Sequence, residues 1–169
     1  MAEEERELIY KPEGHHCFAC GTANPIGLQL TFYRSGNHIC SDITLGKNHV
    51  GWENIAHGGI ISTILDETIG RAIMIQSDDD IWGVTVDLQI RFKKPVPLDE
   101  ELRVLGRITK VSSRFFEGTG ELLLQDGTVA AEGHGKYLKI PLEKITDFDV
   151  HAEEWGILHS SDDPKTFKL

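Results

Sequence analysis

The residues best suited to chemistry lie in one stretch, where two glycines precede a helical pattern that contains two adjacent acids. Backbone N–H groups in the first turn of a helix carry partial positive charge, so Gly58 and Gly59 could hold a developing oxyanion on a polarised carbonyl group. Glu67 lies four residues before Arg71, the favourable order for a helical ion pair. Asp66 has no such local explanation, which makes it the acid to explain by function.

These residues belong to a predicted central helix, His57 to Gln76, the only long segment whose apolar residues recur at helical spacing. At about 100° per residue, one broad arc is suited to burial against a sheet and holds Ile60, Ile61, Ile64, Leu65, Thr68, Ile69 and Ala72. A second arc of small residues would let another backbone come close, and it holds Gly59, Ser62, Thr63, Asp66 and Gly70.

The spacing of Gly58 and Asp66 predicts a site made by two chains. Asp66 follows Gly58 by eight residues, which is about 12 Å along a helix that rises 1.5 Å per residue. Both residues of one chain therefore cannot contact the same carbonyl carbon. A two-fold axis along the arc of small residues would bring Asp66 of one chain toward Gly58 of its copy. The sequence thus predicts a homodimer with two equivalent sites.

The segments around the helix alternate apolar and polar residues, as strands do. The pattern predicts a hairpin of residues 28–33 and 38–45, and four strands in a meander at residues 81–96, 101–111, 114–124 and 128–140. Two strands, one long helix and four strands indicate an α+β fold with the helix packed on an antiparallel sheet.

Length and composition fit one domain. The chain has 169 residues, of which 40% are hydrophobic, enough for a single core. Residues 1–14 are charged and contain Pro12 and Gly14, so we expect a mobile acidic head. Residues 15–140 form the expected domain. Residues 141–169 are a C-terminal tail whose role the pattern leaves open.

Charge and hydropathy exclude several partners. A formal net charge of -10 argues against nucleic acid, whose phosphates need a basic surface. Charged residues interrupt the longest apolar segment, so we expect no transmembrane span and no membrane partner. The acidic start resembles no secretory signal, and three cysteines without such a signal suggest reduced thiols. We therefore expect a cytoplasmic protein.

A Cys-x-x-Cys motif lies near the N-terminus. Cys17 and Cys20, with the neighbouring His15, could supply two or three zinc ligands. Structural zinc sites usually take a second pair, and no second Cys-x-x-Cys exists. His151 or His159 would complete a site only by folding back. A turn whose small thiols pack under the sheet edge is the simpler interpretation, and we expect no metal.

Three motifs together resemble the phenylacetyl-CoA-thioesterase-like (PaaI-type) branch of the hotdog superfamily. They are Asn54-Ile55-Ala56-His57-Gly58-Gly59, Leu65-Asp66-Glu67 and Gly83-Val84-Thr85-Val86-Asp87-Leu88. Cys17 to Gly21 and Asn24 to Leu28 resemble the opening of many members. The resemblance covers residues 15 to 140. It implies the hotdog fold, a central helix wrapped by a five- to six-stranded antiparallel sheet, and hydrolysis of an acyl-CoA thioester in a homodimer.

The resemblance also assigns roles. Asp66 matches the family's general base or nucleophile, and Gly58, with help from Gly59, matches the backbone amide that holds the thioester oxygen. His57 matches the motif histidine, although a helix cap is an equal alternative. Thr85 matches a hydroxyl residue that helps to position water. Simple alternation turns Thr85 away from the helix, so its role requires a strand twist or a bulge.

Coenzyme A would be part of the substrate, so no separate cofactor is expected. Its phosphates need cations, and four residues are candidates to bind them: Arg91, Lys93, Lys94 and Arg114. The ordinary alternative is that these four are solvated charges at the strand edges. Some members carry an asparagine where this chain has Gly51, and Asn48 or Asn54 is a candidate substitute. Of the two, we assign Asn54 to substrate binding.

Two other functions stay open at this point. Other hotdog proteins are hydratases or dehydratases on acyl-CoA or carrier-bound chains, but this sequence has no hydratase-type Asp-x-x-x-x-His arrangement. A non-catalytic acyl-CoA-binding module is the second alternative, and no helix-turn-helix or positive run suggests a DNA-binding sensor. The sequence chooses neither the acyl group nor between a dimer and a tetramer.

Overall fold

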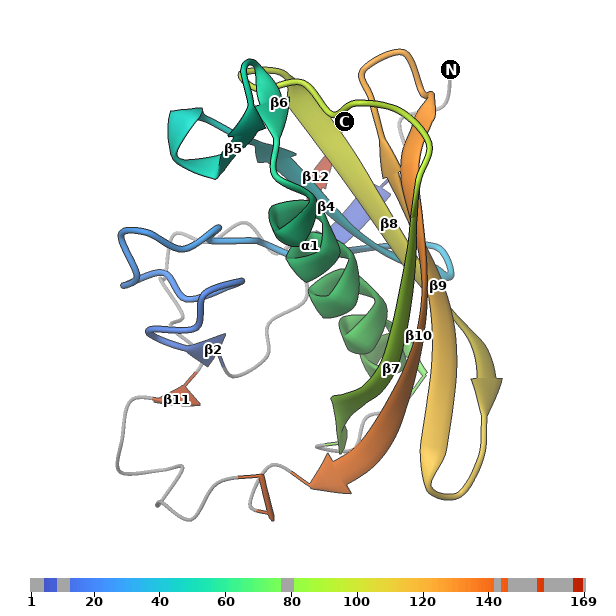
Figure 1. Ribbon diagram of the computed structural model, residues 1–169. Helices are drawn as coiled ribbons and strands as arrows, with labels where there is room; N and C mark the ends of the chain where they lie inside the picture. The colour runs from blue at the N-terminus through green and yellow to red at the C-terminus, as the bar shows by residue number, and fades with distance from the viewer. Residues whose placement is uncertain are drawn as a thin grey trace.

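The structure is a computed structural model that describes residues 5–8, 13–76, 81–141, 144–145, 155–156 and 166–168. One α-helix, α1 (Gly58–Arg71), lies across an antiparallel sheet (Figure 1). The six strands at the centre of this fold are β3 (Tyr33–Ser35), β4 (His38–Thr44), β7 (Ile81–Phe92), β8 (Glu101–Val111), β9 (Phe115–Leu123) and β10 (Val129–Pro141). Their order is β3-β4-β8-β9-β10-β7. This is the predicted hotdog fold.

Short strands extend this arrangement. β1 (Glu5–Leu8) pairs with β3 and with β12 (Thr166–Lys168). β2 (Glu13–Gly14) pairs with β11 (Trp155–Gly156), and β5 (Val50–Trp52) pairs with β6 (Ile55–Ala56). Much of the expected head (1–14) and most of the expected tail (141–169) lie outside the described residues. The domain boundaries stay predictions.

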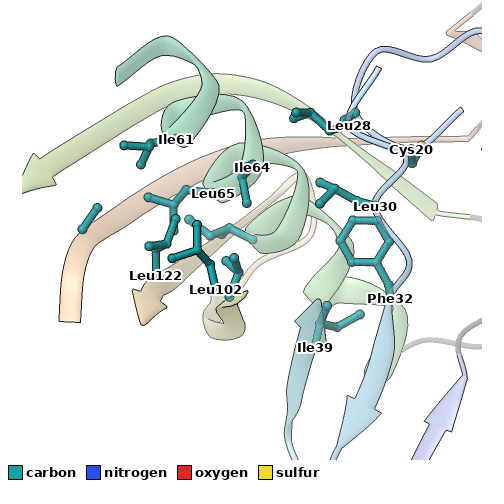
Figure 2. Packing of buried hydrophobic residues seen from close by; sticks show 14 of the residues in the cluster. Cys20, Leu28, Leu30, Phe32, Ile39, Ile61, Ile64, Leu65, Leu102 and Leu122 are labelled. Carbon is teal, nitrogen blue, oxygen red and sulfur yellow. The ribbon is translucent and has the colours of Figure 1, made fainter. Parts of the chain in front are cut away.

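The helix buries the face that its periodicity predicts. Ile64, Leu65, Thr68 and Ile69 are fully buried, and Ile61 and Ala72 nearly so. Figure 2 shows Ile64 and Leu65 among Leu102 and Leu122 of the sheet, which belong to the same core. The α-helix ends at Arg71, earlier than the predicted Gln76, and continues as a short 3-10 helix, η2 (Ala72–Ile75).

Three paired glycines let the helix approach the sheet closely. Gly106 of β8, Gly120 of β9 and Gly133 of β10 lie side by side in register. A Cβ at Gly106 would lie 2.7 Å from the carbonyl oxygen of Thr68, and one at Gly120 would lie 2.7 Å from Ile69 Cγ1. Side chains at these positions would push the helix outward. The glycines therefore fix the height of α1 above the sheet.

The strand predicted at residues 28–33 is wrong, because β3 begins only at Tyr33. Leu28, Leu30 and Phe32 are nevertheless buried beside the helix (Figure 2). The amides of Leu28 and Leu30 bond to the carbonyls of Phe18 and Ala19, at 2.8 and 2.9 Å, and not to a sheet neighbour. The alternation therefore records which side chains are buried and not the hydrogen-bond partner of the backbone.

The predicted four-strand meander is also corrected. β8, β9 and β10 follow one another in the sheet, but β7 pairs with β10 at the far edge and not with β8. The connection after β7 crosses the end of the sheet, where the amides of Lys93 and Lys94 bond to the Ala130 carbonyl and the Ala56 amide bonds to the Val96 carbonyl. Alternation identifies strands without giving their spatial order.

Candidate active site

Asp66 lies half-buried at the wall of a cavity of about 230 Å³. The cavity is lined mainly by apolar atoms, and its wall includes Cys17, Cys20, Trp82, Thr85 and Tyr137. The neighbouring acid has the expected partner, since Arg71 Nε donates to Glu67 Oε1 at 2.8 Å. The structure thus confirms the predicted ion pair and leaves Asp66 as the acid that faces the cavity without a cationic partner among the described residues.

Two hydroxyl groups hold the Asp66 carboxylate. Thr85 Oγ1 donates to Oδ1 at 2.9 Å, and the Tyr137 hydroxyl lies 3.2 Å from Oδ1 and 3.1 Å from the Asp66 carbonyl oxygen. No described residue donates to Oδ2. Burial raises the pKa of Asp66 above its ordinary value, and the neighbouring Glu67 adds to this, while the two hydroxyls act against it. A fixed carboxylate with one unbonded oxygen and a raised pKa suits a general base.

Thr85 reaches Asp66 because β7 contains a bulge. Asp87 pairs with Lys136 and Thr85 pairs with Tyr137, so two residues of β7 face one residue of β10. The extra residue is Val86, and it reverses the alternation of the strand. Ile90 packs against the core. Thr85 lies five residues earlier, so in a strand without the bulge it would face away from the core. The condition set by the sequence for a role of Thr85 is therefore met.

Tyr137 is the residue that sequence reasoning missed. It is buried in β10, and its ring stacks on Phe116 with 4.9 Å between ring centroids. Gly135 makes room for the ring, because a Cβ there would lie 2.4 Å from the Tyr137 hydroxyl. Burial raises the pKa of Tyr137 far above its ordinary range, as does the charge of Asp66, so it remains a donor. The sequence signal that could have pointed to Tyr137 is the glycine two residues earlier on the same face of the strand, which leaves room for a large ring.

The start of α1 determines which backbone amide is open to a ligand. His57 is the N-cap, and its Nδ1 accepts the Gly59 N–H at 2.9 Å. Its carbonyl accepts from Ile60 and Ile61. Within the described part of the chain, the Gly58 N–H has no acceptor. The structure therefore supports the cap interpretation of His57, and the amide open to a ligand is that of Gly58; a direct role of His57 and the help expected from Gly59 stay predictions.

The loop before the helix passes against this end. A Cβ at Gly51 would lie 2.8 Å from His57 Cα, so the asparagine that some relatives carry does not fit on this backbone. Asn54 has a positive φ of 62° in the turn between β5 and β6, and its carbonyl accepts from Leu98 at 3.2 Å. Asn54 shapes the turn, and its role in substrate binding stays a prediction.

The four candidate phosphate-binding cations do not form one patch. Arg91 and Lys93 both pair with Glu132, and Lys94 follows them. Arg114 lies at the other end of β7, where its carbonyl accepts from Lys139, the partner of Gly83. Eight residues of strand separate Gly83 from Arg91, roughly 26 Å. One phosphate group therefore cannot contact both ends, and a role for any of the four stays a prediction.

Metal ligands do not gather in the described residues. His, Cys, Asp and Glu side chains there form no group of three able to hold an ion. His151 and His159, the residues that could have completed a zinc site with Cys17 and Cys20, lie outside the described part.

Comparisons with known proteins show what the chain is similar to. Residues 53–131 match the family model described as Thioesterase superfamily. This part of the chain is similar to thioesterase-superfamily domains. An uncharacterized protein of Schizosaccharomyces pombe is 33% identical over 46% of this chain and 44% of its own length. Acyl-coenzyme A thioesterase THEM4 of Mus musculus is 27% identical over 67% of this chain and 48% of its own length. The chain thus spans about half the length of these relatives.

Solved structures share the fold of this chain. A protein described as a thioesterase superfamily protein has a TM-score of 0.68 and 24% identity, with 73% of this chain and 60% of that chain covered. The PaaI protein of E. coli has a TM-score of 0.60 and 17% identity, with coverage of 67% and 80%. A hypothetical thioesterase of Streptococcus pneumoniae, solved with coenzyme A, has a TM-score of 0.58 and 15% identity, with coverage of 80% and 89%. No helix in the described part is long and apolar enough to cross a membrane.

Proposed function

We propose that the protein hydrolyses an acyl-CoA thioester to a free acid and coenzyme A. The observation that carries the proposal is the Asp66 carboxylate, which faces an apolar cavity. Thr85 and Tyr137 hold its Oδ1, and no described residue donates to its Oδ2. The thioesterase-superfamily match supports thioester chemistry. The mouse relative named as an acyl-coenzyme A thioesterase, and the structural neighbour solved with coenzyme A, support acyl-CoA as the substrate class.

In the proposed reaction, Asp66 Oδ2 accepts a proton from water, and the water oxygen attacks the thioester carbon. The carbonyl oxygen gains negative charge and accepts the N–H of Gly58 from the partner chain. The tetrahedral intermediate then collapses, the C–S bond breaks, and the coenzyme A sulfur takes the proton from Asp66. Thr85 and Tyr137 keep the carboxylate in place throughout. A direct attack by Asp66 would instead form a mixed anhydride with the acyl group and release coenzyme A. Where water then attacks the Asp66 carbonyl carbon of this anhydride, a single turnover in heavy-oxygen water leaves solvent oxygen in the Asp66 carboxylate.

Geometry supports the use of two chains. Gly58 and Asp66 stand eight residues apart on α1, about 12 Å by helix rise, so the amide and the carboxylate of one chain cannot share a carbonyl. The hydroxyls of Ser62 and Thr63, on the arc of small residues, donate back to the carbonyls of Gly58 and Gly59 at 2.9 Å. A second helix that packs on this arc would therefore bury few polar groups that lack a hydrogen bond.

The edge of the sheet supports the same assembly. β7 has twelve residues and is the last strand of the sheet. Val84, Val86 and Phe92 on it are 37%, 51% and 53% exposed. Proteins rarely leave a long apolar edge strand open, since it pairs readily with other strands. Pairing of β7 with the β7 of a second copy would cover these side chains and join the two sheets in a homodimer.

The decisive experiment replaces Asp66 with Asn and measures thiol release from short, long and aromatic acyl-CoA esters. The amide oxygen still accepts from Thr85 and Tyr137, so the fold is kept while the base is lost. We expect kcat to fall by about 10² to 10⁴-fold, the usual contribution of a positioned base. Asp87→Asn, an exposed acid on the same strand as Thr85, is the matched control and keeps full activity. Equal turnover by Asp66→Asn would reject the assignment.

The same screen distinguishes the other functions. Hydration of crotonyl-CoA, seen as loss of double-bond absorbance without thiol release, would indicate a hydratase. Coenzyme A that co-purifies with the protein, with no ester hydrolysed, would indicate a binding module.

A further inference from the structure

Two thiols on the wall of the cavity are held against each other. Cys20 Sγ lies 3.3 Å from Cys17 Sγ, and both residues line the cavity that contains Asp66. The turn that carries them is tight, because the Gly21 amide bonds to the Cys17 carbonyl at 2.9 Å and a Cβ at Gly21 would lie 2.6 Å from the Cys17 backbone. A disulfide bond, about 2.05 Å long, requires only a small further approach of the sulfurs.

The two thiols differ in reactivity. The hydrogen bond from Cys20 lowers the pKa of the half-buried Cys17 to about 6, which favours the thiolate form of Cys17. The same bond and burial raise the pKa of Cys20. Cys17 is thus suited to attack, and Cys20 is the neighbouring thiol that can follow.

A fixed cation stands beside the second sulfur. Arg71 Nη2 donates to Cys20 Sγ at 2.9 Å, and Arg71 is only 4% exposed. Its guanidinium is held between the rings of Phe32 and Trp82, with Cζ 4.7 and 5.7 Å from their centroids. A guanidinium at this distance stabilises the Cys20 thiolate once Cys17 has lost its negative charge.

Cys40 provides an internal contrast. It is buried in β4, where its Sγ contacts the Tyr33 carbonyl oxygen at 3.4 Å. It lies outside the cavity lining. A general sensitivity to oxidants would affect Cys40 as well, whereas a built pair would react first.

We propose that Cys17 and Cys20 are a reversible dithiol–disulfide pair, with a peroxide as the oxidant. The Cys17 thiolate attacks one oxygen of hydrogen peroxide. The S–O bond forms, the O–O bond breaks, and the leaving hydroxide takes a proton from solvent. Cys20, having given up its proton, then attacks the Cys17 sulfur. The S–S bond forms, the S–O bond breaks, and the leaving hydroxide takes up a proton as water. Two thiols are oxidised and one peroxide is reduced to two waters.

This inference goes beyond the proposed hydrolysis. A disulfide would replace two thiols on the wall of the cavity that contains Asp66. Its test uses no acyl-CoA, so failure of the proposed function leaves the result unaffected.

The experiment exposes the reduced full-length protein to hydrogen peroxide after the reductant is removed. Free thiols are counted in denaturant, and peptides are mapped by mass spectrometry. Of the three thiols, we expect Cys17 and Cys20 to join within one chain, with loss of two hydrogen atoms and full recovery in dithiothreitol. Cys40→Ser forms the same link. Cys20→Ser accumulates a sulfenic acid on Cys17 that dimedone traps, while Cys17→Ser keeps both remaining thiols over the same exposure. Circular dichroism verifies that each variant is folded.

Three results would overturn the proposal. The first is oxidation of Cys40 as fast as that of Cys17. The second is dimedone labelling of Cys20 in Cys17→Ser at the rate seen for Cys17. The third is stoichiometric zinc in the purified protein, lost when either Cys17 or Cys20 is replaced, which would make the pair a metal site.

Discussion

Gly58→Pro tests the proposed oxyanion site with a single missing hydrogen-bond donor. Gly58 is the first residue of α1, a position where proline is well tolerated because the N–H there has no helical partner. His57 has φ -67° and ψ 135°, the extended conformation that a residue before proline prefers. A Cβ at Gly58 would lie 3.4 Å from Phe92 Cζ, an ordinary contact. The substitution therefore removes the amide donor and keeps the helix.

The magnitude follows from the number of donors. The His57 ring already accepts the Gly59 N–H, so Gly58 supplies the donor that is left. Loss of one oxyanion donor costs about 2.7 to 4 kcal/mol, or about 10² to 10³-fold in kcat. Gly58→Ala retains the N–H and adds a Cβ, so it is the matched control and stays near wild-type activity. Thiol release gives kcat, and thermal unfolding verifies the fold. Equal kcat in the proline and alanine variants would refute the reasoning.

Mixed dimers extend this test to the two-chain site. Gly58→Pro and Asp66→Asn chains are each inactive alone, but a dimer of unlike chains contains one site with both residues intact. Random pairing of equal amounts therefore restores about a quarter of wild-type turnover. No recovery is expected if each site lies within one chain or if the protein is a monomer.

Two further predictions follow from the contacts of Asp66, and a third follows from the packing of α1 on the sheet. Thr85→Val removes a hydroxyl that lowers the pKa of Asp66, so the acidic limb of the pH profile of kcat/KM moves to higher pH. Tyr137→Phe moves this limb in the same direction but by less, because the hydrogen bond from Tyr137 is longer. A limb that does not move in either variant would contradict the prediction. Burial raises the pKa of Asp66 in the folded state. The folded protein therefore loses stability as the pH rises from the ordinary pKa of an aspartate through the raised pKa of Asp66. Asp66→Asn does not ionise, so its melting temperature relative to that of the wild type rises from acid to neutral pH. Gly120→Ala places a Cβ 2.7 Å from Ile69 and lowers the free energy of unfolding by about 1 to 3 kcal/mol, measured in urea; an unchanged value would argue against the close approach of the helix.

Local patterns predicted the helix and its chemistry because those properties depend on residues close in sequence. The buried face of α1 and the ion pair of Glu67 with Arg71 both follow from a repeat of 3.6 residues. The same repeat leaves Asp66 on another face of the helix from this ion pair. The strands after the helix were found with nearly correct bounds for the same reason. Their spatial order was not found, because the place of β7 beside β10 depends on partners more than thirty residues away.

The sequence by itself determined which residues stand at the start and the middle of one helix, and that they lie too far apart to act together in one chain. Tertiary structure decided what surrounds them. The bulge at Val86 that turns Thr85 to Asp66 arises from register with β10, and Tyr137 reaches the carboxylate only because the sheet places Gly135 and Phe116 around its ring. Side-chain period is a local property of a strand, whereas register and close packing are set between segments that meet only in the folded chain.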